Sequence, residues 1–169
     1  RSIAAVERLA MARCDVAMKC TVEGRLALQT PGNGNLLETV LALYGLDTAK
    51  DVREIRLSDG RGHSIVALVG GPATGRSDRR RQGVWVNSRP VAVRGMLEAA
   101  EAAYPLGVLP GRRHPLLLLL LSLPPAEVDA NVHPTKAEVR LQRQNEVFGL
   151  AVAAVRQAAE ETLPAAGVT

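Results

Sequence analysis

The chain has 169 residues, of which 47% are apolar and 22% are charged, and its formal net charge is +4. These values are typical of a globular protein and exclude wholesale disorder, and the length suits one domain. One Trp, two Tyr and one Phe are too few for a protein that stacks single-stranded bases, and two Cys and three scattered His predict no metal site or disulfide framework. The longest apolar run is far shorter than the ~20 residues of a membrane helix, so we expect a cytoplasmic protein with no membrane partner.

The N-terminal third of the sequence predicts a helix, a hairpin and a second helix. Apolar residues recur at helical spacing over residues 1–13, and alternation over residues 14–23 predicts a half-buried strand. Gly24 marks the turn of a hairpin to a second strand. Asn35 then precedes a helix that Gly45 closes, because asparagine caps the first turn of a helix and glycine commonly ends the last one.

The middle of the sequence predicts strands that differ in exposure. Residues 52–57 predict an exposed strand, whereas residues 64–69 are apolar on both faces, as in a central strand. Residues 70–81 form a polar loop rich in glycine and arginine. Residues 84–86 predict a short strand, and a helix is expected to follow it with Arg94 in its first turn.

The C-terminal third completes a mixed pattern. Residues 116–123 are mostly leucine and predict the centre of the sheet. A strand near residues 138–141 and an amphipathic final helix follow. This order predicts an α+β fold in which helices pack mainly on one face of a mixed β-sheet. We predict one domain over residues 1–162 and a C-terminal tail over residues 163–169.

The string D-A-N-V-H-P-T-K is dense in polar residues directly after the leucine-rich strand, and it ends at Lys136. Pro134 holds His133 in an extended conformation, and Asp129 and Asn131 can hydrogen-bond nearby backbone, so we expect a rigid loop. Lys136 is one of three lysines, and its ammonium group is a compact charge suited to a phosphate. From spacing alone, the simpler interpretation is a tight β-turn with a solvated lysine.

The string V-W-V-N-S-R-P-V-A-V-R places Arg89 and Arg94 where a strand ends and the next element begins. Both side chains can face a phosphate backbone, although surface arginines often serve only solubility. Arginines of the neighbouring loops can extend such a surface, but solvated loops are the better interpretation for Arg76, Arg79, Arg80, Arg81, Arg112 and Arg113.

These two strings resemble the MutL family of DNA mismatch repair proteins. The family pattern is F-V-N-G-R-x-V followed by V-D-V-N-V-H-P-x-K-x-E-V-R-F, and this chain has V-W-V-N-S-R-P-V and then L-P-P-A-E-V-D-A-N-V-H-P-T-K-A-E-V-R. The resemblance runs in order over nearly the whole chain. It implies the transducer domain, the second half of the family's N-terminal region, with a ribosomal protein S5 domain 2-like fold. The absent initiator methionine fits an excised fragment.

The resemblance also implies a function and a set of site residues. Lys136 corresponds to the lysine that contacts the γ-phosphate of ATP in the adjacent ATPase domain of the gyrase–Hsp90–histidine kinase–MutL (GHKL) superfamily. Arg94, and with it Arg89, falls where DNA binding is expected. Support of the lysine loop is assigned to Asp129, Asn131, His133 and Pro134.

The implied partners are the chain's own GHKL domain, DNA, a MutS-type mismatch recognition protein and a second copy of the intact protein. ATP with Mg is the expected cofactor of the intact protein, an ATPase, whereas the fragment alone is expected to bind no cofactor and to be inactive. The implied location is the bacterial nucleoid.

Three positions depart from the family pattern. Ser88 replaces a glycine that can require a positive φ angle, whereas Ala130 and Leu141 are conservative changes in packing. Two other functional classes are alternatives to this family. A small-molecule kinase needs a phosphate loop that leads into a helix, and Gly70 to Gly75 precede a basic loop and a strand instead. A stand-alone RNA-binding module of the same fold remains the main alternative.

Overall fold

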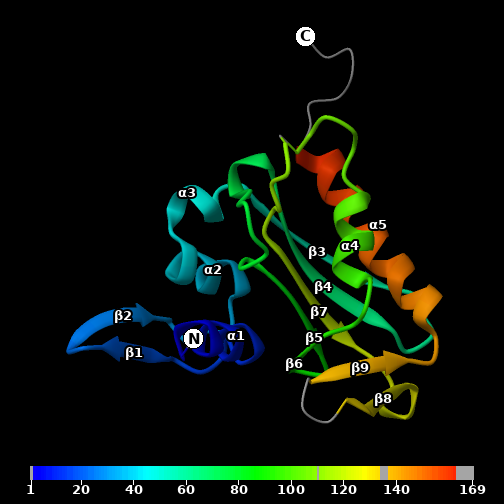
Figure 1. The fold of residues 1–169 in the computed structure, drawn as a ribbon, viewed down its shortest axis with the longest axis horizontal. Helices are drawn as coiled ribbons and strands as arrows, with labels where there is room; N and C mark the ends of the chain where they lie inside the picture. Colours follow the sequence, from blue (N-terminus) through cyan, green and yellow to red (C-terminus); the bar gives the residue numbers. More distant parts are fainter. Residues whose placement is uncertain (1, 110, 134–136, 163–169) are drawn as a thin grey trace. The chain divides into compact units, whose positions relative to one another are not determined.

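The computed structural model describes residues 2–109, 111–133 and 137–162, with backbone only for residues 2, 131–133 and 162. The chain divides into two compact units, residues 1–51 and 52–169, which Figure 1 colours from blue to cyan and from cyan to red. The predicted tail, residues 163–169, lies outside the described residues, and the predicted domain over residues 1–162 stays a prediction.

The first unit combines helices with one hairpin. Its elements are α1 (Ser2–Ala12), β1 (Lys19–Val22), β2 (Arg25–Gln29), α2 (Leu36–Tyr44) and α3 (Leu46–Ala49). The predicted cap and stop of the second helix are confirmed. The Asn35 side chain accepts a hydrogen bond from the backbone N–H of Glu38 at 3.0 Å, and the Gly45 N–H donates to the carbonyl of Leu41 at 2.9 Å.

The first hairpin has the predicted turn but a shorter first strand. Glu23 and Gly24 have φ angles of 52° and 78°, which is the pattern of a two-residue type I′ turn. The strand expected over residues 14–23 begins only at Lys19. The alternation was misleading because the carbonyl of Cys14 accepts a hydrogen bond from Gly34, in the loop before α2, at 3.0 Å.

Within the described residues, the second unit contains the main sheet and two α-helices. Its strands are β3 (Val52–Ser58), β4 (Ser64–Gly70), β5 (Gln82–Val86), β6 (Arg89–Val91), β7 (Leu117–Ser122), β8 (Val128–His133) and β9 (Glu138–Leu141). Its helices are α4 (Met96–Ala102), α5 (Gln144–Thr162) and the short 3-10 turns η1 (Pro72–Thr74) and η2 (Pro125–Glu127). No helix in the described ranges is long and apolar enough to cross a membrane.

The five-stranded sheet has the order β3-β4-β7-β5-β6, with β7 at its centre as the leucine run predicts. β5 and β7 are parallel, and the other neighbours are antiparallel, so the sheet is mixed. β3 lies at one edge, as its predicted exposure requires. Leu119 faces Ala67 of β4 on one side and Val84 of β5 on the other.

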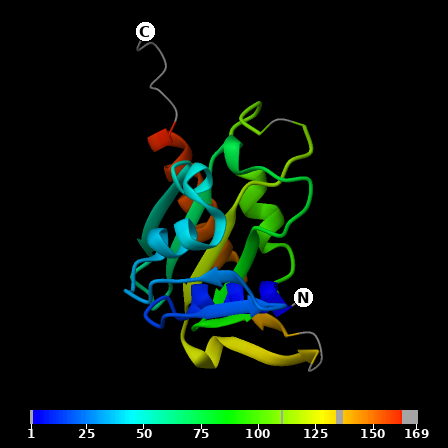
Figure 2. The same ribbon diagram turned by 90° about the vertical axis from the view of Figure 1, so that its left-hand side faces the viewer.

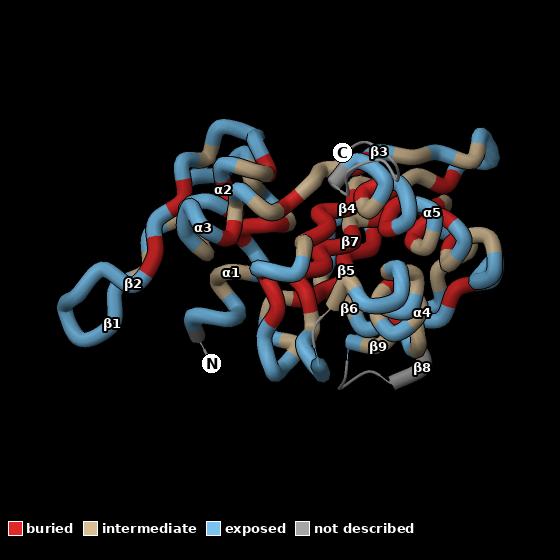
Figure 3. Tube along the Cα trace, turned by 90° about the horizontal axis from the view of Figure 1, so that it is seen from above, coloured by how far each residue is buried: buried red, intermediate tan, exposed pale blue. Residues whose placement is uncertain are grey.

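Helices α4 and α5 cover one face of this sheet, which confirms the predicted arrangement. α5 contacts β3 and β4, and α4 contacts β5 and α5. Alternate residues of each strand enter the core, as the two-residue period of a strand requires. Figure 3 shows the buried residues concentrated along the central strands. Inward-facing residues include Ile65, Ala67, Val69, Val84, Val86, Leu117, Leu119 and Leu121.

The segment after β5 folds differently from the prediction. Asn87 and Ser88 have φ angles of 51° and 68°, and this type I′ turn leads into β6 rather than into a helix. Gly95, with φ 82°, stands directly before α4. Because a helix cannot include this left-handed conformation, Arg94 lies in the turn before α4 and not in its first turn.

The polar string before Lys136 also folds differently from the prediction. A rigid loop was expected after residue 128, but β8 continues through His133 and pairs with β9. Asp129 faces Arg140, and His133 faces Glu138, with an irregular register between these two pairs. Asp and Asn disfavour strands by propensity, and pairing with β9 overrides that preference.

The positive φ angle of Ser88 leads to a stability prediction. A side chain in the left-handed region costs about 1 kcal/mol, whereas glycine adopts this region without strain. We therefore expect Ser88→Gly to raise the free energy of unfolding, measured by urea denaturation, by up to about 1 kcal/mol. Ser64→Gly, in the strand β4, should lower it. A loss of stability in Ser88→Gly would show that Ser88 makes a compensating contact.

Candidate functional site

The lysine loop is described only by the strands that enclose it. Pro134 and Lys136 lie outside the described residues, and the side chains of Asn131 and His133 are not described. Asp129 is exposed on β8. The contact of Lys136 with a γ-phosphate and the supporting roles assigned around it therefore stay predictions.

Backbone hydrogen bonds join the lysine hairpin to the strand that carries the predicted DNA-binding arginines. The N–H of Ala92, directly after β6, donates to the carbonyl of Ala137 at 3.0 Å, and the N–H of Val139 donates to the carbonyl of Ala92 at 3.0 Å. Ala92 and Glu138 thus form a parallel bridge. Figures 1 and 2 both show β6 and the β8–β9 hairpin side by side at one end of the second unit.

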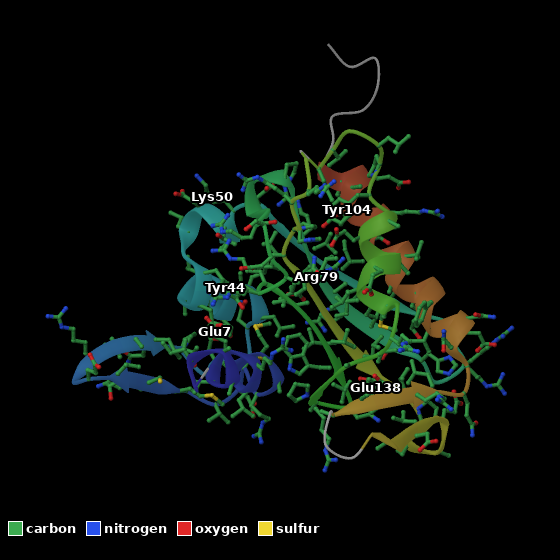
Figure 4. The ribbon with its side chains drawn as sticks, in the orientation of Figure 1. Glu7, Tyr44, Lys50, Arg79, Tyr104 and Glu138 are labelled. Atoms are coloured by element: carbon green, nitrogen blue, oxygen red, sulfur yellow. The ribbon has the colours of Figure 1, made fainter. Side chains whose placement is uncertain are left out.

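Arg79, in the arginine-rich loop, is engaged in the fold at the other end of β5. Its guanidinium donates to Glu101 of α4 at 3.1 Å and to the side chain of Gln82 at 2.8 Å. Glu101 also accepts from the amide of Gln82 at 2.9 Å and is hydrogen-bonded to His114 at 2.8 Å. Gln82 is buried, and Figure 4 labels Arg79 within this region. This network ties loop 71–81 to α4, which is a structural use of Arg79.

Other arginines of these loops are also engaged within the protein. Arg80 lies 3.8 Å from a carboxylate oxygen of Asp78. Arg76 and Arg113 both donate to the carbonyl of Gly75, at 2.9 and 3.3 Å. These contacts weaken the case that this loop contributes to a phosphate-binding surface.

Arg89 and Arg94 differ from these engaged loop arginines. Both are exposed, and neither has an ion pair or hydrogen bond among the residues that the structure describes. They do not share one cavity. Arg89 lines a mostly apolar hollow of about 390 Å³ between the β5–β6 and β8–β9 hairpins. Arg94 lines a second hollow of about 260 Å³, together with Arg140 of β9. The sequence analysis assigned no role to Arg140, although its alternation with Val139 and Leu141 signals an exposed strand position.

A buried ionic cluster around His63 was also missed. The His63 side chain is 0% exposed, yet its Nδ1 lies 2.5 Å from Asp59 Oδ2 and its Nε2 lies 2.7 Å from Glu127 Oε1. Hydrogen bonds to Glu127 and then to Asp59 raise the pKa of His63 above its ordinary value. No sequence pattern could have shown this pairing, because Glu127 lies 64 residues further along the chain.

The cluster ties three segments of the second unit together. Asp59 lies in the turn between β3 and β4, Glu127 ends η2 directly before β8, and Glu146 lies in the first turn of α5. Burial raises the pKa of Asp59, but hydrogen bonds from His63 and from the backbone N–H of Arg61 outweigh it, so the pKa is lowered. The imidazole thus hydrogen-bonds to the β3–β4 turn and to the segment before β8, and its Nδ1 lies 3.6 Å from Glu146 Oε2 at the start of α5.

Asp59, His63 and Glu146 also place ligand atoms within 4.8 Å of one another, as a cation site requires. Two ligands of one cation lie about 3 Å apart or more, since each metal–ligand bond is about 2 Å long. The 2.5 Å between Nδ1 and Oδ2 is a hydrogen-bond distance instead. Arg61 and Arg143 already lie 3.2 and 3.5 Å from Glu146 Oε1. We interpret the cluster as ion pairs around an imidazolium.

Comparison with known proteins gives a consistent result. A family model described as DNA mismatch repair protein, C-terminal domain, matches residues 40–160. The DNA mismatch repair protein MutL of Desulforudis audaxviator is 40% identical over 153 residues, which cover 90% of this chain and 27% of that protein. MutL of Symbiobacterium thermophilum is 41% identical over 159 residues, which cover 94% of this chain and 24% of that protein. The chain thus spans about a quarter of the length of these relatives.

Two solved structures share the fold. The N-terminal domain of a DNA repair protein superposes with a TM-score of 0.72 at 20% identity, over 94% of this chain and 52% of that chain. The 43K ATPase domain of Thermus thermophilus gyrase B, in complex with an aminocoumarin, gives a TM-score of 0.50 at 14% identity, over 95% of this chain and 46% of that chain. At these identities the similarity shows the fold alone, and it agrees with the predicted S5 domain 2-like architecture.

The His63 cluster predicts how stability depends on pH. The raised pKa of His63 stabilises the fold fully below the ordinary value of 6.5, and this contribution is lost as pH rises through the folded-state pKa. The lowered pKa of Asp59 stabilises above the ordinary value of 3.8 and is lost as pH falls through the folded-state pKa. We expect the free energy of unfolding, from urea denaturation, to be highest between these two values.

An NMR titration of the His63 imidazole in the unmodified chain tests whether the pKa of His63 is raised. Its midpoint should lie above 6.5. In His63→Gln, the decline of stability on the alkaline side should become shallower. A midpoint at or below the ordinary histidine value would contradict the ion-pair interpretation.

Proposed function

Because the chain belongs to the MutL family of DNA mismatch repair proteins, we propose that it is the transducer segment of a longer mismatch repair protein. It couples ATP binding in an adjacent GHKL ATPase domain to dimerisation and to DNA binding. The observation that carries the proposal is the pair of backbone hydrogen bonds that Ala92 makes with Ala137 and Val139. They join the hairpin that carries the lysine string to the segment that carries the unpaired arginines.

Lys136 is the residue that this chain brings to the nucleotide. In the described ranges, the glycines at 70, 71 and 75 flank the short turn η1 and lead to β5, so they do not form a phosphate loop at the start of a long helix. The nucleotide therefore needs the adjacent domain to hold it. ATP, with Mg, supplies the γ-phosphate whose negative charge attracts the Lys136 ammonium group.

The hairpin converts that attraction into a change of orientation. β9 is anchored to Ala92, and η2, directly before β8, is anchored to His63 through Glu127. A pull on the segment between β8 and β9 is therefore transmitted to the whole second unit and not only to a loop. One orientation of this unit toward the ATPase domain is then favoured, because only that orientation lets Lys136 reach the phosphate.

The DNA contact is assigned to Arg89 and Arg94, which have no partner within the described part of the second unit and lie on the segment joined to the lysine hairpin. Arg89 and Arg94 lie at the end where β6 meets β9, whereas the arginines of loop 71–81 are mostly engaged elsewhere. An exposed, unpaired guanidinium is free to contact a backbone phosphate. Such contacts carry no sequence preference, which suits a protein that must act wherever a mismatch occurs.

Family membership supports the remaining partners. We assign to the intact protein a MutS-type mismatch recognition partner, a homodimeric state and a cytoplasmic, nucleoid-associated location. We assign the turnover of ATP to the intact protein, whose ATPase domain would hold the nucleotide.

Titration of the chain with duplex DNA at several salt concentrations tests the DNA contact. The binding constant should fall steeply with salt and show little sequence preference. Arg94→Gln should weaken binding and reduce the slope of log K against log salt by about 1, because one phosphate contact is lost. Arg156→Gln, an exposed arginine of α5, is the matched control and should change neither. Tight binding selective for RNA would instead support a stand-alone RNA-binding module.

A Lys136→Ala substitution in the full-length protein tests the nucleotide contact. Loss of a charged group that stabilises the transferred phosphate should lower ATP turnover by about 100-fold. Lys19→Ala, an exposed lysine of β1, is the matched control and should turn over ATP normally. Circular dichroism should show both variants folded. Unchanged turnover in Lys136→Ala would exclude the γ-phosphate role.

A further inference from the structure

The hollow of about 260 Å³ beside Arg94 has the features of a site for an anion. It lies where β9 approaches the start of α5, and its wall includes Arg94, Arg140 and Gln144. These three residues are exposed, and they come from three separate elements: the turn before α4, the strand β9 and the first turn of α5. Three donor side chains thus converge on one depression.

Backbone pairing explains why the two arginines share this wall. Ala92 and Glu138 form a parallel bridge. Arg94 follows Ala92 by two residues, and Arg140 follows Glu138 by two residues. The bridge brings the two segments together, and the side chains of Arg140 on β9 and of Arg94 in the turn before α4 both line the hollow. The hydrogen bonds of Ala92 with Ala137 and Val139, both 3.0 Å, hold this register.

The wall carries an excess of positive charge, although Asp129 stands opposite Arg140 in the register of β8 and β9. Neither Arg94 nor Arg140 has a hydrogen bond or ion pair within the described ranges, and the wall adds one carboxylate, Glu138, which Figure 4 labels on β9. Two guanidinium groups on one small hollow repel each other, and an anion bound between them would offset this repulsion. Each presents a planar pair of donors that matches the oxygens of a phosphate.

The start of α5 adds to this positive field. Gln144 begins a helix of 19 residues, whose first N–H groups have no partner within the helix and carry the positive end of its dipole. Glu146 in the same turn would oppose an anion, but Arg61 and Arg143 lie 3.2 and 3.5 Å from its Oε1 and offset its charge. The Gln144 amide supplies an uncharged donor on the same side.

We propose that Arg94, Arg140 and Gln144 form a subsite for one phosphate group, which in the intact protein is a phosphate of the DNA backbone. The inference rests on the proposed function for its choice of DNA, but the phosphate chemistry stands on the hollow itself. It gives Arg140 a role equal to that of Arg94 and places the path of the DNA backbone across β9 and the start of α5.

Two titrations of the chain test the subsite, one with a short duplex DNA and one with inorganic phosphate. Arg140→Gln should weaken duplex binding by about tenfold at low salt and reduce the salt slope by about 1. Arg140→Lys keeps the charge but loses the planar fork, so its binding should be intermediate. Arg156→Gln removes the same charge from α5 outside the hollow and should change binding less than twofold. Inorganic phosphate should shift the NMR signal of the Gln144 side-chain amide, and less so in Arg140→Gln.

Combining Arg94→Gln with Arg140→Gln distinguishes one shared phosphate from two separate ones. Residues that bind the same group are not additive, so the double variant should lose less than the product of the two single losses. Full additivity would overturn a shared subsite. Thermal melts should confirm that the variants fold, as expected for exposed positions.

The outcomes separate this inference from the proposed function. If Arg94→Gln weakens DNA binding while Arg140→Gln behaves like Arg156→Gln, the subsite is wrong and the DNA function stands. If inorganic phosphate shifts Gln144 but the chain binds no duplex, the subsite takes a free phosphate and the DNA function of this chain is wrong. If neither ligand has an effect at Gln144 or Arg140, the subsite is excluded.

Discussion

The candidate site depends on two backbone hydrogen bonds of Ala92, one with Ala137 and one with Val139, both 3.0 Å long. Without them, the edge strand β6 of the five-stranded sheet and the β8–β9 hairpin would not be joined by backbone hydrogen bonds at this point. With them, the arginine string and the strands on either side of the lysine loop belong to one surface, although residues 95–128 separate the two strings in the sequence. Main-chain bonds of this kind do not depend on the side chain at position 92, so Ala92 carries no signal of its importance in its residue type.

The His63 cluster anchors the β8–β9 hairpin of that surface to the rest of the second unit. Glu127 ends η2 directly before β8 and binds His63 at 2.7 Å, and the carbonyl of Glu127 accepts a hydrogen bond from Gln142, directly after β9, at 2.9 Å. Both ends of the hairpin are therefore held at one point of the fold. A buried imidazolium is costly to desolvate, so it contributes more to a single defined geometry than to net stability.

The sequence predicted those features that local physics controls. The cap at Asn35, the turn at Gly24 and the central strand over residues 116–123 follow from conformational preference and hydrophobic pattern, and the structure confirms them. It did not predict β6 or the His63 cluster. The Asn87–Ser88 turn lacks the expected glycine, and the partners of His63 come from segments that only the tertiary fold brings together. The sequence around Arg140 indicates only an exposed strand position, because its proximity to Arg94 arises only in the tertiary fold.

Net charge alone says little about where this protein meets an anion. The chain carries 21 basic residues, of which three are lysines, and most of the loop arginines are engaged by carboxylates or carbonyls of the fold. The informative quantity is which guanidinium groups the fold leaves without a partner. In the hollow at the start of α5, two such groups share one wall, and a bound anion there would offset their mutual repulsion. A basic surface forms a candidate anion site where the fold places unpaired guanidinium groups side by side.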